Sequence, residues 1–238
     1  MNRKWKTALN IALEPPAPVS KHEFLGRFPQ PVISGQTFIL SQLKYTSKYM
    51  WGISLITFLL TILGSDFFEQ DMIWTVSALI PFLALSFVAE TSRSQTYGMQ
   101  ELEMTTRFSF RSLFLARMGI SGAFHLCLLI VLIAISALCQ ITSVFQTGLY
   151  LLVPYLSTAF FGLWIIRKFS GPETLYACTG IAAGISCLGI FTRTLFPFFY
   201  TLQYTSVWLI LGLTMCILVI TELWKNMKRT EELPWNYS

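Results

Sequence analysis

Residues 113–138 read LFLARMGISGAFHLCLLIVLIAISAL, and Arg117 is the one charged side chain in that run. A helix needs about 20 mostly apolar residues to cross a bilayer, so the run is long enough to do so. Five shorter apolar stretches occupy residues 49–66, 72–89, 147–166, 174–191 and 207–224. Only 12% of the chain is charged, against about 25% in a soluble domain. The sequence therefore predicts an all-α integral membrane protein with six transmembrane helices.

The basic residues predict which way these spans cross the membrane. Lysine and arginine collect at the cytoplasmic ends of spans. With the N-terminus inside, all but Arg193 of the 17 lysines and arginines fall at those ends. The short outer loop around Asp66, Glu69 and Asp71 carries only acidic charges. Both termini are predicted to be cytoplasmic, in a multi-pass protein of the cell (plasma) membrane. The net charge of +5 follows from this topology, so we expect no nucleic-acid binding.

The chain divides into three parts around the predicted spans. Residues 1–33 form a cytoplasmic segment that begins as an amphipathic helix and continues as a proline-rich linker. Residues 34–224 form the six-span domain, and residues 225–238 form a cytoplasmic tail. The apolar run near the N-terminus is too short for a cleavable signal peptide. The first span is therefore expected to act as the insertion signal.

A second amphipathic segment, residues 34–47, leads into the first span. It starts at Ser34, a candidate N-cap, and carries Phe38, Ile39 and Leu43 among polar residues. We predict an elbow helix that lies in the membrane interface at 34–47. A plain cytosolic lead-in to the span is the alternative.

The most polar block in the middle of the chain is ETSRSQTYGMQELEMTTRFSFR, residues 90–111. The charge distribution places it on the cytoplasmic side, and the part after Gly98 has the composition of a short helix. Glu103 and Arg107 are spaced to pair along that helix. Two interpretations remain open for it. The helix lies against lipid headgroups, or it inserts into a groove on another protein.

Two features on the later spans predict helix packing and an unusual outer segment. Gly180 and Gly184 have the G-x-x-x-G spacing that lets two helices approach closely, within one chain or between copies. Residues 192–206 should lie outside, yet they read TRTLFPFFYTLQYTS and are aromatic rather than polar. A pair of short re-entrant helices and an aromatic belt at the interface both account for this. Arg193, Phe196 and Pro197 form a candidate outer gate in that segment.

Residues with the spacing of a catalytic or metal site do not occur in the sequence. It has neither the G-x-x-x-x-G-K-S/T pattern of a P-loop nor the G-x-S-x-G pattern of a hydrolase elbow. His125 stands alone in the third span, where a lone histidine commonly hydrogen-bonds a neighbouring helix. Glu222 is interpreted as an interfacial anchor of the last span. The chain is therefore predicted to be no enzyme by itself, with no catalytic residues, no cofactor and no metal of its own.

The layout of the chain resembles a known family. In order, Glu90, Arg93, Gly98, Glu101 and Arg117 match the pattern that runs from the second to the third span of type-2 ABC exporter permeases. That family has six spans, a preceding elbow helix, a coupling helix between spans two and three, and re-entrant helices between spans five and six. In this chain these would be residues 34–47, 96–110 and 192–206. One departure is Thr106-Arg107, where the family often has a proline.

The resemblance implies an ATP-driven transporter. A separate P-loop ATP-binding subunit, which would hold ATP and Mg²⁺, would push on the coupling helix. A second permease copy or a related permease would complete the pathway among membrane lipids, and the cargo would be an exported amphipathic or hydrophobic peptide, lipid or drug. The residues expected to contact the ATP-binding subunit are Tyr97, Gly98, Glu101, Leu102, Glu103 and Arg107.

Two other classes of function compete with a permease. A membrane scaffold or sensor would hold a cytosolic regulator through residues 1–33 and the inner loop, without transport. An intramembrane enzyme would need paired histidine or acidic groups inside the spans, and the sequence lacks them.

Overall fold

The computed structural model describes residues 35–67, 72–96, 110–139, 144–169, 171 and 173–232. Within these ranges the regular structure is entirely helical, as the sequence predicts. The chain separates into two units, residues 1–38 and residues 39–238. The site lies in the second unit, which is described here by itself.

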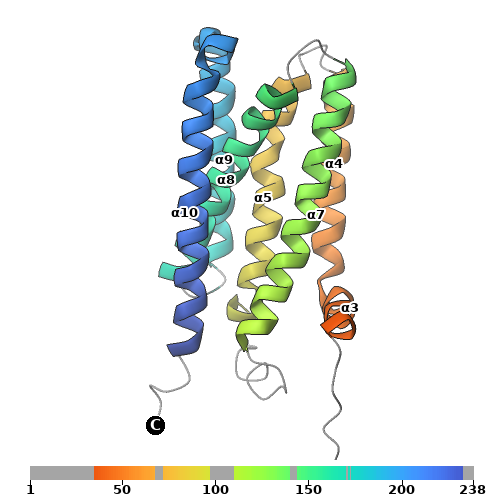
Figure 1. Ribbon diagram of the computed structural model, residues 1–238, viewed down its shortest axis with the longest axis vertical. Coiled ribbons are helices and arrows are strands. Elements are labelled where there is room, and N and C mark those ends of the chain that lie inside the picture. The colour runs from red at the N-terminus through yellow and green to blue at the C-terminus, as the bar shows by residue number, and fades with distance from the viewer. Residues whose placement is uncertain are drawn as a thin grey trace, which may run out of the picture. The chain divides into compact units, whose positions relative to one another are not determined.

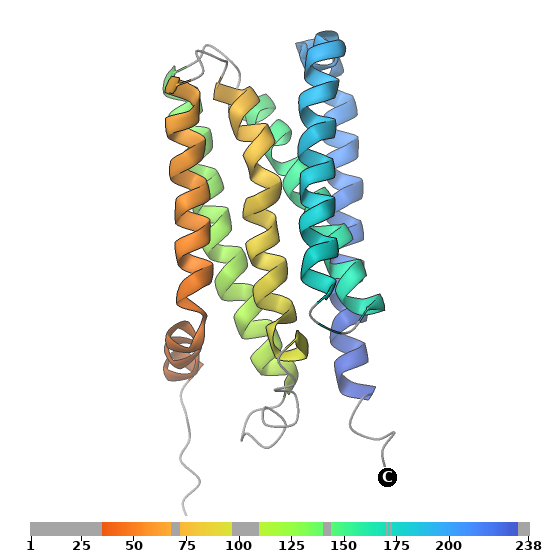
Figure 2. The same cartoon turned by 180° about the vertical axis from the view of Figure 1, so that it is seen from behind.

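Six long helices of this unit each contain one of the predicted spans. In Figures 1 and 2 they run alternately in opposite directions, so that successive links lie at opposite ends. One end of the unit holds the starts of α4, α7 and α9. The same end also holds the ends of α3, α5, α8 and α10. Their bounds are α3 Gly35–Tyr45, α4 Lys48–Phe67, α5 Met72–Thr96, α7 Phe110–Cys139, α8 Val144–Lys168, α9 Glu173–Leu195 and α10 Thr205–Glu232.

Four stretches within the described ranges are long and apolar enough to cross a membrane. They are Ser112–Ser136, Val144–Lys168, Glu173–Leu195 and Leu202–Lys228. Helix α3 and the part of α4 up to Leu63 meet at a bend of 73° and make a fifth if they are taken as one broken span. Helix α5 contains the predicted span 72–89 but is not among the four, and it carries Pro81 and a polar end.

The bend between α3 and α4 follows from local hydrogen bonding. The Thr46 backbone N–H and hydroxyl both donate to the Gln42 carbonyl, at 2.9 and 3.0 Å, which closes the last turn of α3. The Ser47 hydroxyl then accepts from the Tyr49 N–H at 3.3 Å, the role of an N-cap side chain at the start of α4. The chain therefore changes direction between Thr46 and Lys48.

Helix α5 packs against α4, α7, α8 and α9. It approaches α8 closely at one point, where a Cβ on Gly162 would lie 2.6 Å from a methyl group of Val88. Only glycine fits a contact this close, because the valine side chain is short and stiff. One apolar cluster surrounds this contact and includes Leu163, and a second joins Ile80 and Leu132 further along α5 and α7.

The link between α9 and α10 falls on the predicted re-entrant segment 192–206. Residues 192–195 continue α9, and two 3₁₀ turns follow, η1 Pro197–Tyr200 and η2 Leu202–Tyr204. The Trp208 indole N–H donates to the Phe199 carbonyl at 2.9 Å, which ties η1 to the first turn of α10. Each 3₁₀ element is a single turn, so this segment contains two short turns where a pair of re-entrant helices was one of the two expectations. That the segment enters the membrane stays a prediction.

Candidate functional site

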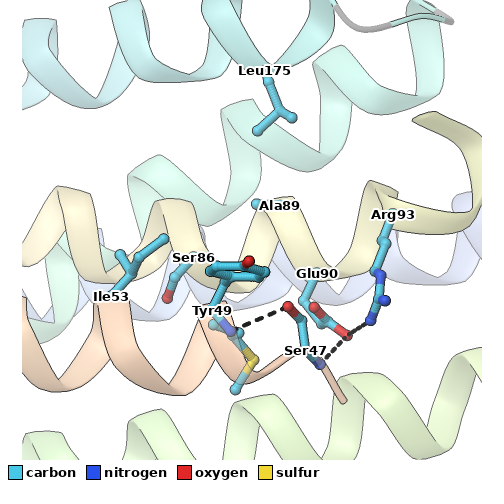
Figure 3. Close-up of a pocket in the computed structure, with 9 residues that line it drawn as sticks. Ser47, Tyr49, Ile53, Ser86, Ala89, Glu90, Arg93 and Leu175 are labelled. Carbon is cyan, nitrogen blue, oxygen red and sulfur yellow. Dashed lines mark hydrogen bonds and ion pairs between the residues drawn. The ribbon is translucent and has the colours of Figure 1, made fainter. Parts of the chain in front are cut away.

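Glu90 is a carboxylate of α5 that directly follows the apolar stretch 72–89. Its side chain is 4% exposed, and it lies in the last third of α5. Ser86 and Arg93 lie one turn before and one turn after it on the same side of the helix, and Ala89 is adjacent. Figure 3 shows these side chains facing the start of α4.

Glu90 and Arg93 join the end of α5 to the turn between α3 and α4. Glu90 Oε1 accepts from the Ser47 backbone N–H at 3.4 Å and lies 3.6 Å from Arg93 Nη1. Arg93 Nη1 also donates to the Tyr45 carbonyl at 3.4 Å. All three contacts are longer than the ordinary 2.7–3.2 Å of a strong hydrogen bond. The junction therefore connects three helices without holding them tightly.

A pocket of about 220 Å³ opens beside this junction, and we call it the elbow pocket. Its polar side is formed by Ser47, Glu90 and Arg93, and Ser86 lines it further along α5 (Figure 3). Its apolar walls come from the first turns of α4, from α5 and from the start of α9; they are Tyr49, Met50, Ile53, Ala89 and Leu175. The arrangement suits a molecule that has both a charged and an apolar part.

Ser86 links the elbow pocket to a buried polar cluster around His125. His125 is 0% exposed, and its Nε2 lies 2.9 Å from the Ser54 hydroxyl and 3.1 Å from the Ser86 hydroxyl. Its Nδ1 lies 3.2 Å from the Tyr155 hydroxyl. The two serine hydroxyls are 2.8 Å apart. These contacts confirm that His125 hydrogen-bonds neighbouring helices, and they join α4, α5, α7 and α8 in one polar core.

A second buried carboxylate, Glu222 of α10, lies at the same end of the unit. Arg167 of α8 donates to it through Nε at 2.8 Å and through Nη2 at 3.2 Å, and Lys225 donates at 3.0 Å. The Asn226 side chain adds a contact to the Leu163 carbonyl at 3.3 Å. Glu222 is therefore more than an interfacial anchor, because it fixes α8 to α10.

The candidate outer gate lies at the opposite end, where α9 turns into α10. The Arg193 guanidinium is 5.0 Å from the centre of the Tyr200 ring, and the ring of Phe196 contacts those of Phe198 and Phe199. Gln146 of α8 donates to the Tyr200 carbonyl at 3.1 Å, and Pro197 begins η1. Arg193 and Phe196 therefore each contact an aromatic ring of η1, which Pro197 begins, and the gating role of these three residues stays a prediction.

The other predicted site residues have different outcomes. Tyr97, Gly98, Glu101, Leu102, Glu103 and Arg107 lie outside the described residues. Gly180 and Gly184 lie on the exposed side of α9, and a Cβ on either would meet nothing within 4 Å. This pair therefore makes no close helix contact within the described part of the chain, which leaves contact between copies as its predicted use.

Three features of the structure were not predicted from the sequence: an ion pair, a close helix contact and the burial of a carboxylate. The ion pair between Arg167 and Glu222 joins residues 55 positions apart, and a pairing at that separation leaves no local pattern. Gly162 has no second glycine at G-x-x-x-G spacing to indicate its contact with Val88. The burial of Glu90 had one signal, since a carboxylate directly follows the apolar stretch 72–89.

Comparison with models of known protein families, with curated proteins and with solved structures finds no match to this chain. The site is therefore interpreted from its own residues.

Proposed function

We propose that this chain is the membrane subunit of an ATP-driven transporter of the type-2 ABC exporter kind. In this proposal α4, α5, α7, α8, α9 and α10 are six spans, α3 is the elbow helix, and both termini are cytoplasmic. The charges support this orientation. Among the described residues, the basic side chains Lys44, Lys48, Arg93, Arg117, Arg167, Lys168, Lys225 and Lys228 belong to the helix ends that share one side, whereas Arg193 belongs to the other (Figure 1).

The observation that carries the proposal is the polar junction at the end of α5. Glu90 and Arg93 contact the turn between α3 and α4, and the predicted coupling segment 96–110 begins three residues after Arg93. A force applied to that segment would act on α5 first. Through Glu90 and Arg93 it would reach α3 and α4 as well.

The proposed mechanism divides the work between two kinds of subunit. A P-loop ATP-binding subunit would bind ATP and Mg²⁺, and its closure would push on Tyr97, Gly98, Glu101, Leu102, Glu103 and Arg107. This chain would supply the spans, together with a second copy or a related permease in the plasma membrane. Loose contacts at the α5 end suit this role, because a two-state element must be able to rearrange. The cargo in this proposal is an amphipathic or hydrophobic molecule.

Co-purification from the native host tests the proposal. The tagged chain is isolated in mild detergent, its partners are identified by mass spectrometry, and ATP hydrolysis is measured on the eluate. We expect a stoichiometric P-loop ATPase. It should be lost when Glu101→Lys and Arg107→Glu are combined.

Glu173→Lys is the matched control, since Glu173 is an exposed carboxylate in the first turn of α9. It should leave the partner bound. Recovery of a regulator without ATPase activity would instead favour the membrane scaffold or sensor.

A further inference from the structure

The elbow pocket is lined by charged atoms that have no partner among the described residues. Among the described residues, both contacts of Glu90 go to Oε1, so Oε2 accepts no hydrogen bond from them. Figure 3 shows this second oxygen on the side of Tyr49, away from Arg93. A carboxylate that is 4% exposed and has few contacts would be stabilised by a further donor on this second oxygen.

Arg93 is in a similar position on the rim of the pocket. Both of its contacts in the described chain are made by Nη1, which leaves the Nε and Nη2 donors for another acceptor. Its side chain is 37% exposed, so a bound molecule can reach it from the aqueous side. The pocket therefore offers one acceptor and several donors a few ångströms apart.

The existing ion pair between Glu90 and Arg93 does not prevent a ligand from binding there. Its atoms are 3.6 Å apart, and one partner is more than a third exposed. A contact of this length, made through one nitrogen, is weaker than a two-pronged arginine pair. A ligand with complementary charges can separate the two side chains at little cost and then pair with each.

The two charges decide the class of ligand. An anionic head alone would face the Glu90 carboxylate, and a cationic head alone would face the Arg93 guanidinium. A zwitterionic head satisfies both, with an ammonium on Glu90 and a phosphate on Arg93. The pocket of about 220 Å³ has room for a small head of this kind, since one water molecule takes about 30 Å³ of liquid.

The apolar walls indicate that this head is carried on an acyl chain. Ile53 is 52% exposed and Tyr49 is 83% exposed, and both lie on α4 at the opening of the pocket (Figure 3). In the proposed topology this opening faces the cytoplasmic leaflet at headgroup depth. A lipid could enter sideways and lay its chain along α4.

We propose that the elbow pocket binds an aminophospholipid, with the ammonium of a phosphoethanolamine headgroup on Glu90 Oε2 and its phosphate on Arg93. The inference rests on the proposed function only for the depth of the pocket in the membrane. It names an amine-bearing phospholipid as the amphipathic molecule that this site receives.

Lipid binding to the purified full chain, without any partner subunit, tests the proposal. A short-chain phosphatidylethanolamine with a fluorescent acyl group is titrated into the protein in neutral detergent, and its anisotropy is recorded. Phosphatidylglycerol, phosphatidylcholine and free phosphoethanolamine compete with it in separate arms. We expect the ethanolamine lipid to bind about tenfold more tightly than the glycerol or choline lipid, because each lacks the ammonium N–H groups that donate to Glu90.

Three variants locate the binding. Glu90→Gln should bring the affinity for the ethanolamine lipid down to that for the choline lipid, about tenfold. Ala89→Leu keeps both charges, fills the pocket, and should abolish binding. Glu173→Gln should change nothing. A circular dichroism melt checks that each variant is folded, and Ala89→Leu decides the matter if Glu90→Gln does not fold.

Three results of these titrations would contradict the proposed lipid site. Equal or tighter binding of phosphatidylglycerol, or unchanged affinity in Ala89→Leu, would overturn the proposal. If free phosphoethanolamine competes as well as the lipid, the source is a soluble headgroup and the lipid assignment fails. Because no ATPase subunit is present, failure here leaves the proposed transporter standing, and failure to capture an ATPase leaves the lipid site standing.

Discussion

Glu90 and Glu222 are two buried carboxylates at the same end of the unit, and they are held in opposite ways. Each side chain is 4% exposed and each has an arginine partner. Glu222 receives Arg167 through two nitrogens and Lys225 through a third, at 2.8, 3.2 and 3.0 Å. Glu90 has two contacts at 3.4 and 3.6 Å, both on one oxygen.

This difference separates a fixed part of the protein from a part that can change. A two-pronged arginine contact sets both distance and angle, so Arg167 and Glu222 clamp α8 to α10. The junction at Glu90 has long contacts and a pocket beside it, so the turn between α3 and α4 is held to the end of α5 only loosely. In the proposed transporter the first contact would keep α8 and α10 together, while the second would transmit movement and accept a lipid.

The largest expected effect comes from the contact that sets the distance between α5 and α8. Gly162→Val places a side chain where Val88 already lies, and overpacking of this kind costs about 3 kcal/mol. The loss is measured as the free energy of unfolding, in a mixed-micelle denaturant titration followed by circular dichroism.

Gly180→Val is the control for this substitution, because a Cβ there meets nothing within 4 Å. It should cost well under half as much. Adding Val88→Ala to Gly162→Val should restore part of the stability. If both glycine variants lose the same amount, the close approach of α5 and α8 is not the cause.

The clamp itself is tested next. Arg167→Met removes the two-pronged partner of Glu222, and Lys225 alone remains to balance the carboxylate. Breaking a buried pair costs about 3–5 kcal/mol. We expect about 2 kcal/mol because Lys225 stays and Arg167 is 32% exposed, and the same denaturant titration measures it.

Arg93→Met is the matched change at the open junction. Its expected cost is smaller, about 1 kcal/mol, because the contact that it removes is 3.6 Å long and made through one nitrogen, and Glu90 lines a pocket. Equal losses in the two variants would remove the distinction between clamp and junction.

The smallest expected effect comes from replacing each arginine by lysine, which keeps the charge of the ion pair and changes its geometry. Arg167→Lys keeps the charge but cannot form the two parallel contacts, so we expect a loss of about 1 kcal/mol. Arg93→Lys should be close to neutral, because Arg93 uses one nitrogen only. A thermal melt in detergent ranks the two variants, and a larger loss in Arg93→Lys would contradict the comparison.

The sequence predicts those features of the fold that depend on long apolar stretches. Each of the six predicted spans lies within a helix, and the predicted elbow at 34–47 coincides with α3 to within two residues. These helices are recognisable because apolar composition over a stretch is a property of neighbouring residues, and four of them, α7, α8, α9 and α10, are long and apolar enough to cross a membrane. For residues 192–206 the sequence left a pair of short re-entrant helices and an aromatic belt open, and two 3₁₀ turns occur there.

Contacts between distant residues could not be predicted in the same way. The G-x-x-x-G spacing drew attention to Gly180 and Gly184, yet Gly162 makes the close contact. Spacing describes one helix, whereas close packing depends on what the neighbouring helix presents. For the same reason Glu222 could not be assigned to Arg167, although the hydrogen bonding of His125 was foreseen in kind without its partners.

The central claim is that an ATP-binding subunit attaches where the chain leaves α5. A photoreactive amino acid at Glu103 tests it most directly, with Thr194, an exposed position at the other end of the unit, as control. After irradiation of intact cells, the adduct at position 103 should contain peptides of a P-loop ATPase, and the adduct at position 194 should not. A position 103 adduct with a protein that has no ATP-binding motif would contradict the account.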